Sequence, residues 1–110
     1  MSQSHIKITH YEGEPCIELK GEWDQDGLET FVKAFQKCVP KTELRMYLQM
    51  SELDYLDSAG LGVIMFNMNE LAKQGAKLVL LSPSDEMRQI LRTTSLDKVL
   101  EIRYGFPAIT

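Results

Sequence analysis

The spacing of apolar residues changes once near the middle of the chain, and this change most constrains the fold. Residues 43–50 alternate between apolar and other side chains, which is typical of a strand buried on one face. Further along, helical spacing predicts a helix over residues 58–74 that ends before Gly75. Its apolar stripe comprises Leu61, Ile64, Met65, Met68, Leu71 and Ala72. Residues 54–62 therefore join a strand to the longest predicted helix.

Two neighbouring residues can cap the start of this helix. Asp57 and Ser58 each carry a short side-chain oxygen that can accept an unpaired backbone N–H of the first turn. The small residues Ala59, Gly60 and Gly62 keep the surrounding surface low, so we expect other proteins to reach the Ser58 hydroxyl. A phosphate on Ser58 would be tolerated, because a helix N-terminus holds anions. The residues alone leave a cap and a modification site equally open.

The rest of the chain predicts further elements around this junction. Strands are expected at residues 6–10, 16–20, 77–81 and 101–104, and helices at 26–39 and 83–94. Asp26 and Glu29 have the spacing of a capping box for the first of these helices. The first two strands can form a hairpin, and the later strand–helix–strand connections imply parallel neighbours. The predicted fold is α/β with a small mixed sheet of about four to five strands.

Composition limits the classes of protein that the chain can be. We expect one domain over residues 1–110, ordered from about 4 to 106. The net charge of −4, without a basic patch, argues against a nucleic-acid partner. No leader and no apolar run of membrane-spanning length is visible, so we expect a cytoplasmic protein without membrane insertion. Two cysteines and two histidines, widely spaced, predict no disulfide framework, no metal site and no cofactor.

Three enzymatic interpretations of the junction lack essential residues. A nucleophilic Ser58 would need a base, but no histidine follows it in the chain, and Leu56 replaces the first glycine of a hydrolase elbow. The glycines at 60 and 62 lack the remaining residues of either nucleotide-binding motif. Asp54 and Asp57, three residues apart in a loop, do not define an acid–base pair or a magnesium site. We therefore expect a binding module and not an enzyme.

The sequence LDYLDSAGLGVI at residues 53–64 resembles the signature of STAS-domain anti-sigma factor antagonists, small bacterial proteins of partner-switching pathways in sporulation and general stress response. Residues 19–24, 76–81 and 90–97 extend the resemblance over nearly the whole chain. It departs from the family at Trp23, where leucine is usual. The resemblance implies helices packed mainly on one face of the sheet, and it implies that Ser58 is the phosphorylation site.

The resemblance also implies partners. The unphosphorylated form would bind an anti-sigma factor that is a serine/threonine kinase and would free a sigma factor for transcription. Phosphorylation of Ser58 would end binding, and a PP2C-type phosphatase would restore it. The implied partner-binding residues are Glu22, Trp23, Asp24, Asp54, Asp57, Ser58, Ala59, Gly60, Leu61 and Gly62. For Trp23, an interface anchor and a core side chain remain equally open.

Two other functions stay compatible with the same residues. One is a partner-switch protein whose target is not a sigma factor. The other is a STAS-type structural subunit of a transporter, in which Ser58 need not be modified. Co-purification separates them, because a kinase partner indicates a switch and a transporter ATPase indicates a subunit.

Overall fold

The computed structural model describes residues 5–23 and 25–104, which form a five-stranded sheet and three α-helices. The elements are β1 (His5–Tyr11), β2 (Glu14–Trp23), η1 (Gln25–Gly27), α1 (Leu28–Cys38), η2 (Val39–Lys41), β3 (Arg45–Leu56), α2 (Ser58–Lys73), β4 (Lys77–Leu81), α3 (Asp85–Thr93), η3 (Leu96–Lys98) and β5 (Glu101–Arg103). The strands lie in chain order, with β1 antiparallel to β2 and every later pair parallel. The predicted mixed sheet is confirmed. The expected ordered range of 4–106 begins and ends outside the described residues.

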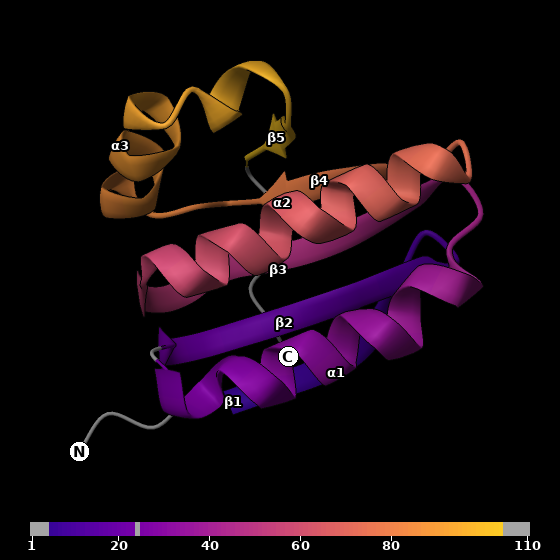
Figure 1. The fold of residues 1–110 in the computed structure, drawn as a ribbon, viewed down its shortest axis with the longest axis horizontal. Helices are drawn as coiled ribbons and strands as arrows, with labels where there is room; N and C mark the ends of the chain where they lie inside the picture. The colour runs from indigo at the N-terminus through magenta and orange to yellow at the C-terminus, as the bar shows by residue number, and fades with distance from the viewer. Residues whose placement is uncertain (1–4, 24, 105–110) are drawn as a thin grey trace.

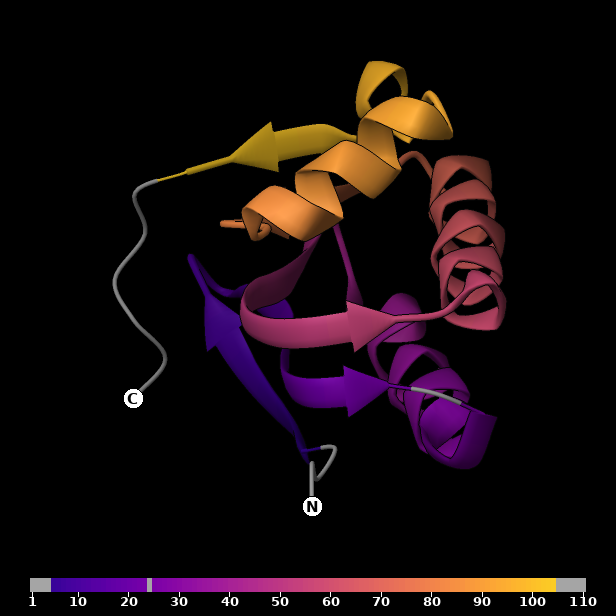
Figure 2. The same cartoon turned by 90° about the vertical axis from the view of Figure 1, so that its left-hand side faces the viewer.

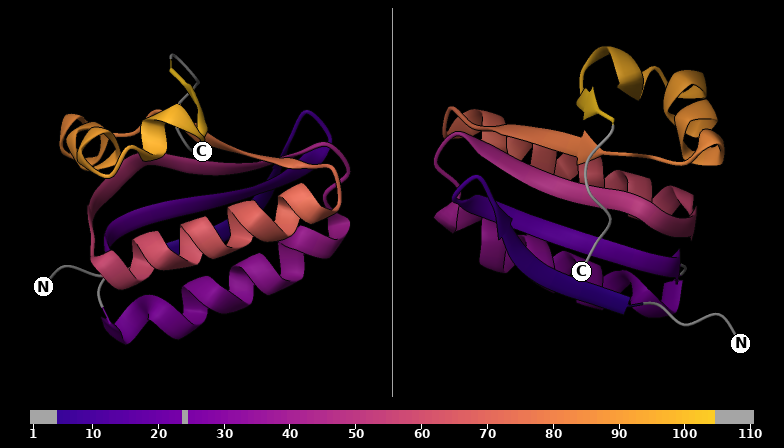
Figure 3. Two further views of the ribbon diagram at one scale, coloured as in Figure 1. Left: turned by 45° about the horizontal axis from the view of Figure 1, so that its top comes forward. Right: turned by 180° about the vertical axis from the view of Figure 1, so that it is seen from behind.

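Helices α1 and α2 lie side by side on one face of the sheet (Figures 1 and 2), as the sequence resemblance implies. Helix α3 lies beyond them, at the end of the sheet formed by β4 and β5. Seen from behind, the strands are in front and α1 and α2 lie beyond them (Figure 3, right). Phe31 and Phe35 of α1 pack with Ile64 of α2 and with the inward residues of the strands in one core. No helix in the described part of the chain is long and apolar enough to cross a membrane.

Strand β3 is longer and more deeply buried than the alternating pattern predicts. It runs on to Leu56, and all of residues 46–50 are buried, because its two faces both pack against other side chains. On the face away from α1 and α2, Tyr47 packs against the buried Cys16 and against Tyr11, whose ring meets it edge-on at 4.9 Å. Leu44, which begins the alternating pattern, precedes the strand and is 63% exposed.

The sequence also makes predictions about the start of α1 and about the two cysteines. The capping box of Asp26 and Glu29 is wrong, because α1 follows the 3-10 turn Gln25–Gly27, and no side chain caps it at Gly27. Both cysteines are free and buried. Burial raises the pKa of the Cys16 thiol to about 11 and also raises that of Cys38.

The Glu14 carboxylate joins the β1–β2 hairpin to the start of β3. It accepts hydrogen bonds from the backbone N–H groups of Glu43, Leu44 and Arg45, at 2.9, 2.6 and 2.7 Å. Burial raises the pKa of Glu14, but the three backbone donors favour the charged form and leave the pKa below its ordinary value. The carboxylate therefore stabilises the fold at neutral pH.

We predict that Glu14→Gln loses about 1 kcal/mol of unfolding free energy at pH 7, an amount kept small because the site is partly exposed. A carboxylate whose pKa is lowered by folding stabilises the protein above its unfolded pKa, and this stabilisation is lost as pH falls through the folded pKa. The difference from wild type should therefore shrink toward pH 3. Urea unfolding at pH 7 and pH 3 measures the difference in unfolding free energy. Glu43→Gln is the control, because Glu43 takes part in this contact only through its backbone N–H. An equal loss at both pH values would contradict this role.

Candidate partner-binding site

At the start of α2, the helix cap and the exposed serine are two different residues. The sequence leaves open whether Ser58 is a cap or a modification site. Asp57 is the N-cap, because its Oδ1 accepts the backbone N–H of Gly60 at 2.9 Å. Ser58 is the first residue of the helix and is exposed. Within the described residues its side chain makes no hydrogen bond. The Ser58 hydroxyl is therefore accessible and is not needed to start the helix.

The ends of β2 and β3 place the predicted site segments beside each other. Glu22 pairs with Tyr55, and Trp23 pairs with Leu56, in parallel register. The backbone N–H of Asp57 then donates to the carbonyl oxygen of Trp23 at 3.3 Å. The carboxyl ends of β2 and β3 lie at the same end of the sheet, where the chain continues toward α1 and α2 (Figure 2). The two segments therefore lie at the same end of the sheet.

Trp23 is a core residue, which corrects its place among the partner-binding residues. Its side chain is 2% exposed, and its ring centroid lies 5.9 Å from that of Phe31. The indole N–H donates to the carbonyl oxygen of Lys20 at 3.0 Å, so this buried polar group is paired. A side chain enclosed in this way cannot anchor a partner. Asp24, the next residue of the predicted set, lies outside the described residues.

The other predicted partner-binding residues differ in exposure: some are exposed at the surface, and others are buried or partly buried beneath it. Gly60 is buried and Leu61 is partly buried. Asp57 is partly exposed. The exposed members are Glu22, Asp54, Ser58, Ala59 and Gly62, which we call the Ser58 surface. It carries acidic groups and, among these members, no basic one.

The outward side of α2 is the part of the site that the sequence did not reveal. Met65, assigned above to the apolar stripe, is 43% exposed, and Phe66 is 62% exposed. The inward residues are Gly60, Ile64, Asn67 and Leu71. Asn67 can lie inside because its Nδ2 donates to the Val63 carbonyl oxygen at 2.8 Å. Because the pattern of apolar residues does not include Asn67, it predicted some wrong residues for the buried side of α2.

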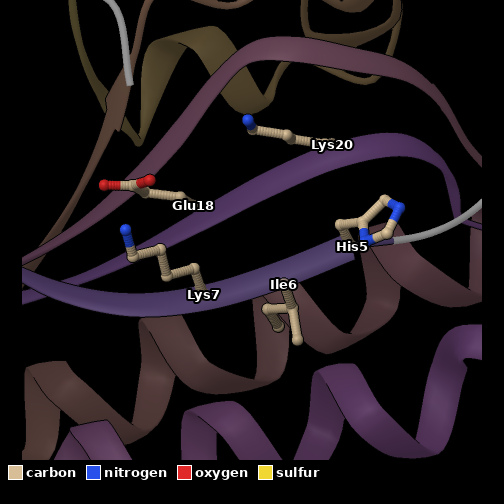
Figure 4. Close-up of a pocket in the computed structure, with 5 residues that line it drawn as sticks. All are labelled: His5, Ile6, Lys7, Glu18 and Lys20. Atoms are coloured by element: carbon tan, nitrogen blue, oxygen red, sulfur yellow. The ribbon is translucent and has the colours of Figure 1, made fainter. Parts of the chain in front are cut away.

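A hollow of about 420 Å³ lies on β1 and β2, not at the start of α2 (Figure 4). Ile6 points toward the helices, while His5, Lys7, Glu18 and Lys20 point to the other side. Lys20 pairs with Glu52 at 3.1 Å, and Glu18 accepts from Thr9 at 2.9 Å. Across the described residues no cluster of three metal-ligating side chains forms. This mixed charge favours no single class of ligand.

Comparison with known proteins agrees with this architecture. The family model of the STAS domain matches residues 5–106. This chain belongs to the STAS domain family. The anti-sigma-B factor antagonist of Listeria monocytogenes is 30% identical over 100 residues, covering 79% of this chain and 87% of the relative. That relative places this STAS domain among the anti-sigma factor antagonists.

Two solved structures share the fold of this STAS domain. The anti-sigma factor antagonist SpoIIAA in its unphosphorylated form has a TM-score of 0.80 at 20% identity, covering 93% of this chain and 89% of that one. The phosphorylated form of SpoIIAA, a cell fate determinant of Bacillus, has a TM-score of 0.76 at 20% identity, covering 93% and 92%.

The two glycines of the STAS motif should respond in opposite ways to alanine. A Cβ at Gly60 would meet Cγ of the buried Leu56 at 2.7 Å, so Gly60→Ala should lose about 1–3 kcal/mol of unfolding free energy. A Cβ at Gly62 meets nothing within 4 Å, so Gly62→Ala should gain about 0.5–1 kcal/mol from its higher helix propensity. Urea unfolding measures both variants. The packing assigned to Gly60 is wrong if the two variants change stability in the same direction.

Proposed function

We propose that this STAS domain is an anti-sigma factor antagonist switched by phosphorylation of Ser58. Unphosphorylated, it binds an anti-sigma factor that is also a serine/threonine kinase and thereby frees a sigma factor. It acts in the cytoplasm as a binding module, and the partner supplies the chemistry. The observation that carries this proposal is the exposed Ser58 hydroxyl at the start of a helix that Asp57 already caps.

The covalent step uses only what the partner provides. The kinase transfers the γ-phosphoryl group of ATP to Ser58 Oγ, ADP leaves, and the hydroxyl proton is released. The product carries a charge of about −1.5 to −2 at pH 7, which the positive end of α2 tolerates. Asp57 keeps its bond to Gly60, so the helix start need not rearrange. The likeness of this fold to both forms of SpoIIAA supports a switch without refolding.

Phosphorylation ends binding through charge. The new dianion lies on a surface that already carries Glu22 and Asp54, with Asp57 adjacent in sequence. A partner that closes over a neutral hydroxyl would have to desolvate this added charge without a compensating cation. Binding therefore weakens while the fold persists. A PP2C-type phosphatase restores the hydroxyl and with it the affinity.

We predict opposite binding behaviour for two Ser58 variants. Ser58→Ala should change the unfolding free energy by less than about 0.5 kcal/mol, because Asp57 supplies the cap. It should bind the anti-sigma factor kinase constitutively. Ser58→Asp should bind it at least about tenfold more weakly because of like charge. Isothermal titration against each such kinase encoded in the host genome measures both variants, with Thr93→Glu on the exposed side of α3 as the charge control.

Two results would overturn the switch. One is equal affinity of Ser58→Ala and Ser58→Asp for the kinase that binds wild type. The other is a Ser58 that stays unmodified in the host under every growth and stress condition, even with phosphatases inhibited, as determined by mass spectrometry.

A further inference from the structure

We infer that Met65 and Phe66 form an apolar anchor that the kinase-type partner covers when it engages Ser58. This inference rests on the proposed function and assigns the partner a second area of contact. The two side chains are 43% and 62% exposed, on the side of α2 opposite its buried residues. Figure 1 shows that the side of α2 away from the sheet carries no other element of the described chain. Burying such side chains is favourable, so their exposure calls for a physical reason.

The outward side of α2 lacks the charges that a solvated helix surface normally carries. No charged residue occurs from Ser58 to Asn69, a stretch of more than three turns, and the first is Glu70. Ala59, Gly62, Met65 and Phe66 are exposed and follow one another at helical spacing. We call these four residues the apolar strip. Depletion of charge with exposed methionine and aromatic residues is typical of the centre of a protein interface.

The apolar strip begins beside Ser58 and lies within the reach of whatever binds there. Met65 follows Ser58 by seven residues, nearly two turns, and so lies on the same side of the helix about 10 Å away. Phe66 lies about 12 Å away along the axis. A standard interface covers about 800 Å² of each partner, a patch about 30 Å across. A protein that places its active site at Ser58 therefore also covers the strip.

Charge complementarity defines the partner further. The end of the strip at Ser58 is flanked by the acidic Glu22 and Asp54, whereas the strip itself is uncharged. A fitting partner presents an apolar pocket whose rim carries no acidic group facing Glu22 and Asp54. A second copy of this chain fits less well, because it would cover Ser58 and bring like charges together. The kinase that must reach Ser58 is therefore the occupant.

The test compares Phe66→Ala and Met65→Ala with Val99→Ala, whose side chain is 62% exposed and lies outside α2. The probes are the purified anti-sigma factor kinases encoded in the host genome. Against the kinase that binds wild type, Phe66→Ala should weaken affinity at least about tenfold, as truncation of a buried aromatic anchor does. Met65→Ala should weaken it less, and Val99→Ala should stay within about twofold of wild type. Thermal unfolding confirms that each variant is folded.

Phosphorylation kinetics provide a readout that a structural role would not give. Phe66→Ala should raise the KM for Ser58 phosphorylation by about the same factor, tenfold or more, and leave kcat unchanged, because the anchor is remote from the hydroxyl.

If one kinase binds wild type and Phe66→Ala equally well, the anchor is wrong and the proposed function stands. If no kinase binds wild type, both fail. If wild type dimerises in sedimentation and Phe66→Ala removes only this, a second copy occupies the strip and the inference is overturned.

Discussion

The geometry of the site depends on Asp57, which forms one hydrogen bond to β2 and another to the first turn of α2. The backbone N–H of Asp57 donates to the carbonyl oxygen of Trp23 at the end of β2, and its carboxylate accepts the N–H of Gly60 in α2. Two strands and a helix are thereby fixed to one another at a single residue. Ser58 follows directly, so its place is set by the sheet and not by a free loop. A precise position on rigid elements suits the recognition by another protein that we propose for Ser58.

Local signals in the sequence predicted the centre of this arrangement well. The change from alternating to helical spacing located the boundary between β3 and α2, and the short polar residues before Ala59 located the cap. The parallel pairing of β2 with β3 brings Glu22 and Ser58 to the same end of the sheet. These features depend on neighbouring residues or on chain order, so the sequence alone is sufficient to read them.

Features that depend on distant packing were not predictable. Trp23 lies in the core because Phe31 of another element receives its ring. The double-sided burial of β3 depends on residues far from it in the chain, among them Tyr11, which precedes it by more than thirty residues. The phase of α2 was misjudged because Asn67 satisfies its own amide within the helix and can face inward. In each case tertiary contacts override the local pattern.

The burial of Cys16 bears on how the protein withstands oxidising stress. The thiolate is the form that peroxides attack, and a pKa of about 11 leaves the Cys16 thiol almost entirely protonated near neutral pH. Cys38 is buried as well, and its pKa is also raised. The two thiols of the native protein therefore offer oxidants little to react with. Under the proposed function, a response to oxidative stress would therefore originate in the partner enzymes, while the two buried cysteines of this domain stay reduced.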